Sequence, residues 1–278
     1  MKVDLHIHSI YSDSSRSLEE IVALAKERNV SLISICDHAT INAYDILPQI
    51  CKNNNIRCVL GVELGVSWNR DKEGIHVLAY NFDINNKGMK LLMDKQYRAI
   101  ACEYIVYNMS KDYPQMSLED YRHFEYPKEK GGWKYLYYAV AKGAAKTYEE
   151  ANLTIFKKYS APNYLSDFGE CSIQDFCKLV KQAGGVSILA HPGYLYRQNP
   201  NDFVDMLKEM KACGIEGIEC YYPSHSKGIT DICVDFCKKN DMRITAGSDC
   251  HGDFDRTEGF TIGALDVSLP MLDLKGIL

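Results

Sequence analysis

The sequence has no long apolar run, and this absence excludes a membrane-spanning helix. No stretch approaches the ~18 apolar residues that a span requires, and the chain opens on a strand-like segment rather than a basic, apolar leader. We therefore expect a cytoplasmic protein with no membrane partner. At 278 residues, 46% of them hydrophobic, the chain is long enough for one α/β barrel or two smaller domains.

The sequence also lacks any CxxC pair among its 11 cysteines. Structural zinc sites and small disulfide-stabilised scaffolds both depend on closely spaced cysteines, so neither class fits this chain. We interpret the cysteines as reduced residues that pack in the core.

An excess of positive charge is missing as well. The formal net charge is −5, whereas general affinity for long nucleic acids requires a basic surface that neutralises phosphates. A small phosphorylated partner or a short oligonucleotide remains compatible with this charge. No feature of the sequence implies a protein partner.

Strand and helix patterns alternate at both ends of the chain, which is typical of an α/β protein. In the first 80 residues the predicted strands are Val3 to His8, Leu32 to Cys36, Cys58 to Val66 and His76 to Tyr80, and the helices are Leu18 to Arg28 and Tyr44 to Asn53. The later helices are Ile173 to Gln182, Asp202 to Ala212 and Gly228 to Lys239, with strands over Val186 to Ala190, Ile215 to Cys220 and Arg243 to Ala246.

Strand patterns are absent between these two halves. The middle segment predicts helices over Lys87 to Ser110, Lys134 to Lys146 and Thr147 to Tyr159, with a Pro- and Gly-containing loop at 126–132. We therefore predict a catalytic barrel domain made of residues 1–86 and 168–278, and a helical insertion or cap domain over residues 87–167.

Seven of the eight histidines fall at or just after a predicted strand, interleaved with carboxylates. The carboxyl ends of parallel strands meet at one edge of a barrel, so these side chains are expected to converge there. A buried cluster of imidazoles and carboxylates is costly without a cation, and mixed nitrogen and oxygen ligands suit Mn, Fe, Zn or Mg. A single histidine at a strand end is more often a structural residue, but this many together favour a metal site.

The motifs that carry these residues resemble the PHP family, named for polymerase and histidinol phosphatase. They are DLHIHSIYSD (4–13), CDH (36–38), GVE (61–63), IHVLAY (75–80), AHP (190–192) and GSDCH (247–251). The helical insertion and the run GIEGIECYYPSH are similar to the stand-alone members that act on nucleotide phosphates.

This resemblance implies a distorted (β/α)7 TIM-like barrel with a helical insertion and a centre of three divalent metal ions, Mn, Fe or Zn, with Mg also suitable. It implies the following ligands: His6, His8, Glu63 and Asp249 for the first ion; Glu63, His76 and His191 for the second; Asp13, His38 and His251 for the third. We assign catalytic roles to Glu63, Asp249 and His225. The expected nucleophile is a hydroxide that bridges metal ions.

The residues that bind the substrate are less distinct. We predict His225, Arg98 and Lys134 for this role; a structural or solvated position is the alternative for each of them. Where nucleotide-acting relatives usually have an Arg-Pro-His-like run, this chain reads GGWKYL at 131–136. Lys134 then replaces the missing positive charge, and Trp133 either stacks on a base or packs.

The resulting hypothesis is a metal-dependent phosphoric monoester hydrolase that acts on a small metabolite, in the first place a nucleotide. The alternatives are a histidinol-phosphate phosphatase, a 3′ or 5′ exonuclease on short oligonucleotides, and a non-catalytic module that binds metal or nucleotides. A comparison of phosphate release across substrates separates these alternatives.

Overall fold

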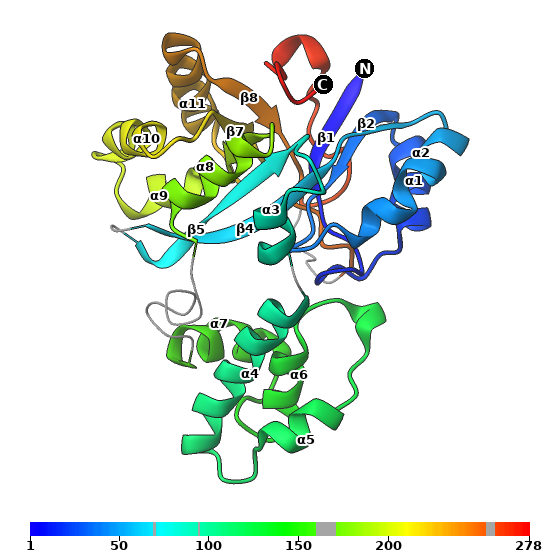
Figure 1. Cartoon of the computed structure of the whole chain (residues 1–278), viewed down its shortest axis with the longest axis vertical. Helices are drawn as coiled ribbons and strands as arrows, with labels where there is room; N and C mark the ends of the chain where they lie inside the picture. Colours follow the sequence, from blue (N-terminus) through cyan, green and yellow to red (C-terminus); the bar gives the residue numbers. More distant parts are fainter. Residues whose placement is uncertain (69–70, 94, 160–170, 254–258) are drawn as a thin grey trace.

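The computed structural model of the protein describes residues 1–68, 71–93, 95–159, 171–253 and 259–278. Figure 1 shows a body of strands flanked by helices, with a separate group of helices below it. No helix in the described ranges combines the length and the apolar character that crossing a bilayer requires.

The strands form two sheets. The first contains three parallel strands in the order β1 (Lys2–Ile7), β2 (Val30–Ile35) and β3 (Arg57–Cys58). The second has the order β4 (Gly61–Trp68), β5 (Asp71–Tyr80), β6 (Val186–Leu189), β7 (Gly217–Tyr221) and β8 (Arg243–Ala246). β5 is antiparallel to both of its neighbours, whereas β6, β7 and β8 are parallel.

Isolated bridges join the two sheets at both edges. Ile7 pairs with Cys250 beyond β8, and His38 beyond β2 pairs with Glu63 in β4. The backbone N–H of Asp249 donates to the carbonyl of His6 at 2.7 Å in the first junction. In the described ranges, these bridges join β1, β2 and β4 to β8 edge to edge, with β3 outside the junctions, in agreement with the predicted distorted barrel.

The barrel helices follow their predicted ranges closely because their caps and apolar faces are local features. α1 (Leu18–Glu27) begins at a capping box between Ser17 and Glu20, and buries Leu18, Ile21, Val22 and Ala25. The remaining barrel helices are α2 (Leu47–Asn53), α8 (Ile173–Gln182), α9 (Gly193–Gln198), α10 (Phe203–Ala212) and α11 (Lys227–Asn240). Helix α9 was not predicted.

The predicted strand from Cys58 to Val66 is wrong in its continuity, because it divides into β3 and β4. The hydroxyl of Tyr44 fills the break, where it accepts hydrogen bonds from the N–H groups of Ile35 (3.1 Å) and Gly61 (2.9 Å). A side chain thus satisfies backbone groups that strand pairing leaves open.

The predicted helix from Lys87 to Ser110 is also wrong in its continuity, because it divides into two helices. The shorter piece, α3 (Lys87–Leu92), packs against the barrel and buries Met89 in the barrel core. The longer piece, α4 (Lys95–Asp112), belongs to the lower group of helices, together with α5 (Leu118–His123), α6 (Lys134–Ala141) and α7 (Tyr148–Tyr159). Helix α5 was not predicted.

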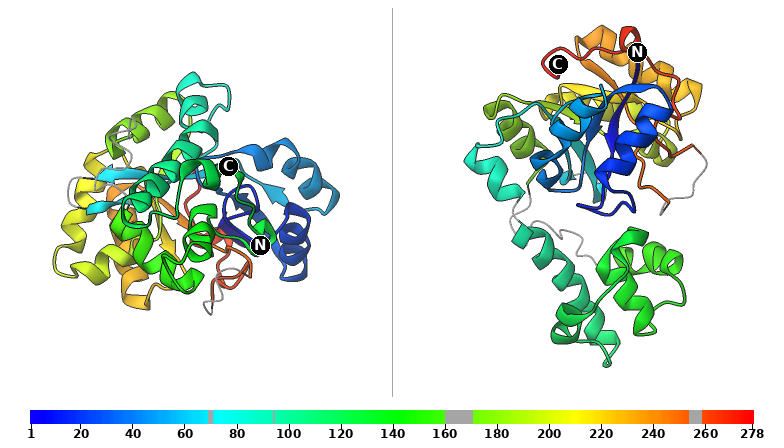
Figure 2. Two further views of the ribbon diagram at one scale, coloured as in Figure 1. Left: turned by 90° about the horizontal axis from the view of Figure 1, so that it is seen from below. Right: turned by 90° about the vertical axis from the view of Figure 1, so that its right-hand side faces the viewer.

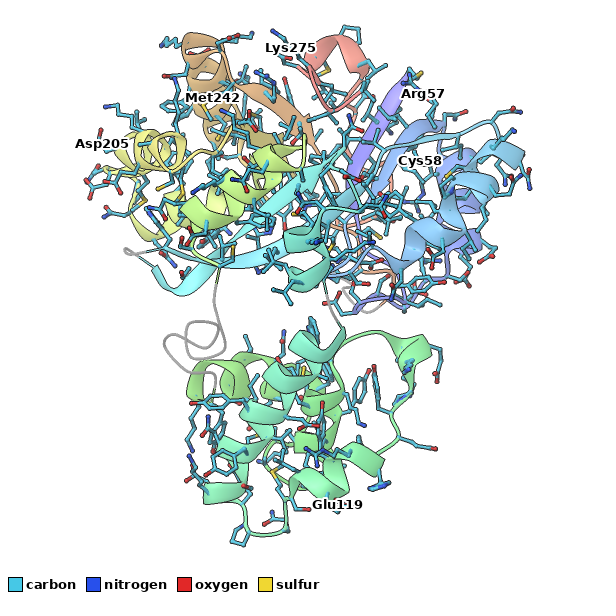
Figure 3. The ribbon with its side chains drawn as sticks, viewed as in Figure 1. Arg57, Cys58, Glu119, Asp205, Met242 and Lys275 are labelled. Carbon is cyan, nitrogen blue, oxygen red and sulfur yellow. The ribbon has the colours of Figure 1, made fainter. Side chains whose placement is uncertain are left out.

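Helices α4 to α7 surround an apolar core of their own. Its fully buried members include Val106, Met109, Leu136 and Ala139. Glu119 in α5 marks the end of this group that is remote from the strands (Figure 3), and the view from the side in Figure 2 shows the same separation. The division of the chain into domains at residues 86 and 168 stays a prediction.

Candidate metal centre

The barrel brings the nine predicted metal ligands together. His6 lies in β1 and His8 directly follows it; Glu63 and His76 lie in β4 and β5; the others follow β1, β2, β6 and β8, namely Asp13, His38, His191, Asp249 and His251. They form three groups, and within each group the donor atoms all lie within 4.8 Å of one another.

The first group consists of His6, His8, Glu63 and Asp249. The Nε2 atoms of the two histidines are 3.2 Å apart, and His8 Nε2 lies 3.2 Å from Glu63 Oε2 and 3.1 Å from Asp249 Oδ1. Four donors placed tetrahedrally at ~2.0–2.2 Å from one ion would be about 3.3–3.6 Å apart. The spacing of these donors therefore fits a metal ion.

The second group shares Glu63 with the first. Glu63 Oε1 lies 3.0 Å from His76 Nδ1 and 3.1 Å from His191 Nε2, whereas Oε2 faces the first group. The two oxygens of one carboxylate therefore face two different groups, as a bridging ligand requires.

The third group contains His8, Asp13, His38 and His251. Asp13 Oδ1 lies 3.4 Å from His251 Nε2, and Asp13 Oδ2 lies 3.7 Å from His38 Nε2. The Nδ1 atom of His8 also faces Asp13, at 3.6 Å. His8 thus links the first and third groups, a link that the sequence did not predict.

Unsatisfied polar atoms gather in these groups. Among the described side chains, the buried atoms without a hydrogen-bond partner include Asp13 Oδ1, His76 Nδ1 and Asp249 Oδ1. Buried polar atoms are nearly always paired, so an orphaned atom in each of the three groups indicates a missing partner there. A cation matches these donors in charge and chemistry.

The carboxylates and imidazoles of the three groups shift one another's pKa values. Burial by itself would raise the pKa of Glu63 and Asp249, but the surrounding imidazoles hold the pKa of each well below its usual range. Burial would lower the pKa of His8, and the adjacent carboxylates of Asp249 and Glu63 raise it to about 10. The carboxylates are thus ionised and require positive charge, which either ring protons or metal ions can supply.

The backbone is strained where two of these residues leave their strands. Asp249 has a φ of 54° and His191 a φ of 29°, in the left-handed region that residues with a Cβ rarely adopt. Such strain persists only where the surroundings enforce it, and it concentrates at functional sites. Hydrogen bonds enforce it here: Asp249 N–H donates to the His6 carbonyl and His191 N–H to Glu219 Oε2.

Comparison with known proteins agrees with this geometry. The PHP domain family matches residues 4–218. The chain belongs to the PHP family. It is a metal-dependent hydrolase of the PHP phosphoesterase type.

Three curated relatives align over nearly the whole chain. A 5′-3′ exoribonuclease of Haemophilus influenzae is 27% identical over 90% of both chains. A phosphoribosyl 1,2-cyclic phosphate 1,2-diphosphodiesterase of Eggerthella lenta is 24% identical over 94% of this chain and 99% of its own. A 3′,5′-nucleoside bisphosphate phosphatase of Chromobacterium violaceum is 24% identical, with coverages of 93% and 91%.

Solved structures show the same fold. A protein from Bifidobacterium adolescentis superposes with a TM-score of 0.71 at 23% identity, covering 91% of this chain and 88% of its own. The PHP fold therefore extends over most of the chain.

Two residues of this PHP site were missed from the sequence. Glu219 in β7 is fully buried; its Oε1 accepts from His6 Nδ1 at 3.0 Å and its Oε2 from His191 N–H at 2.8 Å. Tyr222 donates its hydroxyl to Asp249 Oδ2 at 2.8 Å. The segment Ile215 to Cys220 holds two glutamates, Glu216 and Glu219, and the available signal for Glu219 was its place between the apolar residues Ile218 and Cys220.

We expect Glu219→Gln to weaken metal binding without unfolding the protein. The carboxylate keeps the proton of His6 on Nδ1, so that Nε2 faces the first group with its lone pair. Loss of such a partner typically lowers metal affinity ~10- to 100-fold. Metal titration measures the effect, and Glu216→Gln is the matched control because Glu216 accepts from the Ser187 backbone instead. Equal affinities of the two variants would contradict this role.

The structure places the predicted substrate residue His225 among backbone groups. Its Nδ1–H donates to the Cys220 carbonyl and its Nε2 accepts from Gly193 N–H, both at 3.0 Å. Burial lowers the pKa of His225, in keeping with a neutral ring. Both ring nitrogens are occupied, so this geometry supports the structural alternative, and the catalytic role stays a prediction.

The other two predicted substrate residues belong to the insertion. Lys134 Nζ donates to the Arg122 carbonyl at 3.1 Å and lies 4.8 Å from the centre of the Tyr121 ring, so its charge is used within the insertion. Arg98 lies in α4, and its side chain is outside the described residues. Their binding roles stay predictions.

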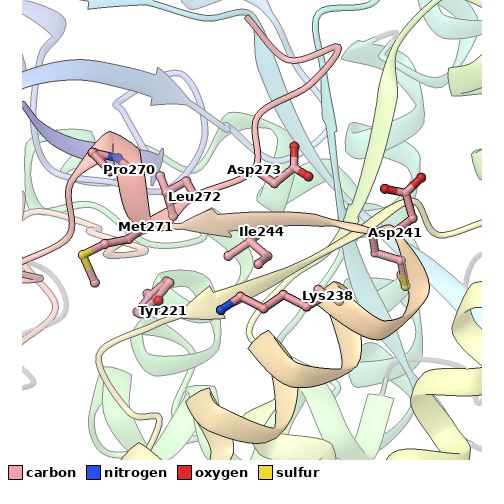
Figure 4. A pocket seen from close by; sticks show the side chains of 10 residues that line it. Tyr221, Lys238, Asp241, Ile244, Pro270, Met271, Leu272 and Asp273 are labelled. Atoms are coloured by element: carbon pink, nitrogen blue, oxygen red, sulfur yellow. The ribbon is translucent and has the colours of Figure 1, made fainter.

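A cavity of about 550 Å³ lies elsewhere on the molecule, between β7, β8, α11 and the C-terminal segment (Figure 4). Its lining includes Tyr221, Lys238 and Asp273, and none of the nine PHP-motif residues. The chemistry is therefore expected at the strand ends rather than in this cavity.

Proposed function

We propose that this PHP protein releases phosphate from a phosphate monoester of a small metabolite, a nucleotide in the first place, with three divalent ions bound in the three groups. The observation that supports this proposal most directly is the continuity of the groups. Glu63 links the first to the second and His8 links the first to the third. Three adjacent cations would suit the three non-bridging oxygens of a phosphate monoester.

The ligands of the three ions would be those predicted from the motifs, with His8 also facing the third. When bound, such ions lower the pKa of water and neutralise the charge that develops on a phosphoryl group. Glu219 orients His6, and the hydroxyl of Tyr222 holds Asp249 so that Oδ1 faces His6 and His8. These contacts pre-organise the ligands before the substrate arrives.

The named substrates of the relatives support a nucleotide or its derivatives. They comprise RNA, a cyclic phosphoribosyl phosphate and a nucleoside bisphosphate. Each carries a phosphate on ribose, which is the feature that these substrates share. The exoribonuclease relative also favours a second candidate function, the stepwise removal of nucleotides from the 5′ end of short RNA.

A hydrolysis screen with manganese-loaded protein tests both candidates, with phosphate release measured for the monoesters and the products separated by chromatography for the diester and the oligonucleotide. The panel contains nucleoside monophosphates, nucleoside 3′,5′-bisphosphates, ribose 5-phosphate, histidinol phosphate, a cyclic phosphodiester and a 5′-phosphorylated oligoribonucleotide. We expect the highest kcat/KM on a nucleotide. Faster degradation of the oligonucleotide from its 5′ end would favour the exonuclease, and the absence of turnover on the whole panel would refute both.

A further inference from the structure

The insertion reaches the metal groups through the loop before α6. Gly132 N–H donates to the carbonyl of Asp13 at 2.6 Å, and the next residue, Trp133, places its ring centroid 5.7 Å from that of His38. Asp13 and His38 both belong to the third group. The loop therefore brings an indole ring to the edge of the proposed centre.

Trp133 lies on the accessible side of the groups. The side chains of His6 and His8 are fully buried, whereas that of His38 is 18% exposed and that of His76 is 41% exposed. The ring centroids of His38 and His76 are 5.4 Å apart, and the rings meet edge to face. A phosphate bound at the groups would thus extend the rest of its molecule past His38 and His76, alongside Trp133.

The position of Trp133 is held from several directions. Its backbone N–H donates to the Tyr148 hydroxyl at 2.9 Å, and the preceding turn is held by the Tyr137 hydroxyl, which donates to the Gly131 carbonyl at 3.0 Å. Gly131 and Gly132 have φ values of 73° and 80°, which only glycine adopts without strain. A half-buried ring held in this way loses little entropy when a ligand stacks on it.

Lys134, the residue after Trp133, does not direct its charge toward the metal groups. The amine of Lys134 points to the Arg122 carbonyl, so the insertion presents an aromatic face beside the third group. An indole face attracts planar rings by stacking and offers no charge to a phosphate. A ligand that uses this edge fully therefore carries a phosphate and, beyond it, a flat ring.

We propose that Trp133 is a specificity-determining residue that stacks on the nucleobase of the substrate, so that the site prefers nucleotides to sugar phosphates that lack a base. This inference rests on the proposed function, because it takes the phosphate to bind at the metal groups. It assigns the selection for a base to the insertion and the binding of phosphate to the barrel.

Equilibrium binding to manganese-loaded protein tests the inference apart from turnover. The ligands are inorganic phosphate and the phosphonate analogues of adenosine 5′-monophosphate, adenosine 3′-monophosphate and ribose 5-phosphate, which lack the scissile P–O bond. Base stacking on an aromatic residue predicts a nucleotide Kd ~10- to 100-fold lower than that of the ribose analogue. Trp133→Ala is expected to remove this preference and to leave phosphate binding and metal content unchanged.

Two further variants sharpen the result. Trp133→Phe keeps an aromatic face and should retain most of the preference. Tyr107→Ala removes an exposed aromatic ring from α4, elsewhere on the insertion, and should change nothing. The inference is overturned if the native protein shows no preference, if Trp133→Ala retains it, or if Trp133→Ala loses metal. A failure of the proposed function would instead appear as the absence of phosphate release by native protein.

Discussion

We expect Glu63→Gln to release metal and to lower phosphate release by on the order of 1,000-fold. Glu63 is 1% exposed, and its two oxygens face two different groups, with His76 and His191 on one side and His8 on the other. Glutamine keeps the size of the side chain but removes its charge and turns one acceptor into a donor. Both groups would thus lose a ligand through one substitution.

Elemental analysis of the dialysed protein and a phosphate-release assay measure this effect. Glu27→Gln is the matched control, because the same change is made at the exposed end of α1. Far-ultraviolet circular dichroism separates loss of metal from loss of fold. A folded Glu63→Gln protein with native metal content and activity within tenfold of native would refute the shared-ligand assignment.

Gly247→Ala is expected to damage both the site and the stability of the protein. A Cβ at this position would lie 2.1 Å from the Cβ of His6, 2.6 Å from Glu219 Oε1 and 2.8 Å from the nitrogen of His6. These neighbours are a backbone atom and two tightly held side chains, so the strands before the first group must separate. Overpacking of this kind costs about 3 kcal/mol, which would lower the Tm by roughly 6–12 °C.

Thermal unfolding and metal titration of Gly247→Ala check this prediction. Gly228→Ala is the matched control, because a Cβ there would meet only the Ser226 hydroxyl at 3.8 Å inside α11. Alanine is the better helix former, so the control should keep its Tm or gain up to ~1 kcal/mol of stability. If both variants unfold at the native temperature and bind metal alike, the close packing beside Gly247 contributes nothing measurable to the free energy of unfolding, and the prediction is refuted.

Local signals explain why much of this protein was predictable. The Ser17–Glu20 capping box indicates the start of helix α1, and the glycine pair Gly184–Gly185 indicates the end of α8 at Gln182. The gathering of the histidines was predictable for a different reason, since the carboxyl ends of parallel strands meet at one edge of a barrel. The assignment of His6, Glu63 and Asp249 to one ligand set came from the resemblance of their motifs to the PHP family, and the structure brings these three residues together.

Features that depend on contacts between distant segments were not predictable. The break between β3 and β4 depends on the hydroxyl of Tyr44, which arrives from another element. His225 Nε2 accepts from the N–H of Gly193, 32 residues away, and Lys134 Nζ donates to the carbonyl of Arg122, 12 residues away; no spacing in the sequence indicates either bond. Burial alone made Glu219 a partner of His6, because the same glutamate on an exposed strand would be solvated.

The sequence by itself determined the class of this protein and the identity of its candidate ligands, because alternating strands, capped helices and histidines at strand ends are local patterns. Tertiary structure alone decided that His8, like Glu63, faces two groups, and that Trp133 from the insertion lies beside His38. Such relations are distances across the fold, and they depend on how the barrel closes and where the insertion rests.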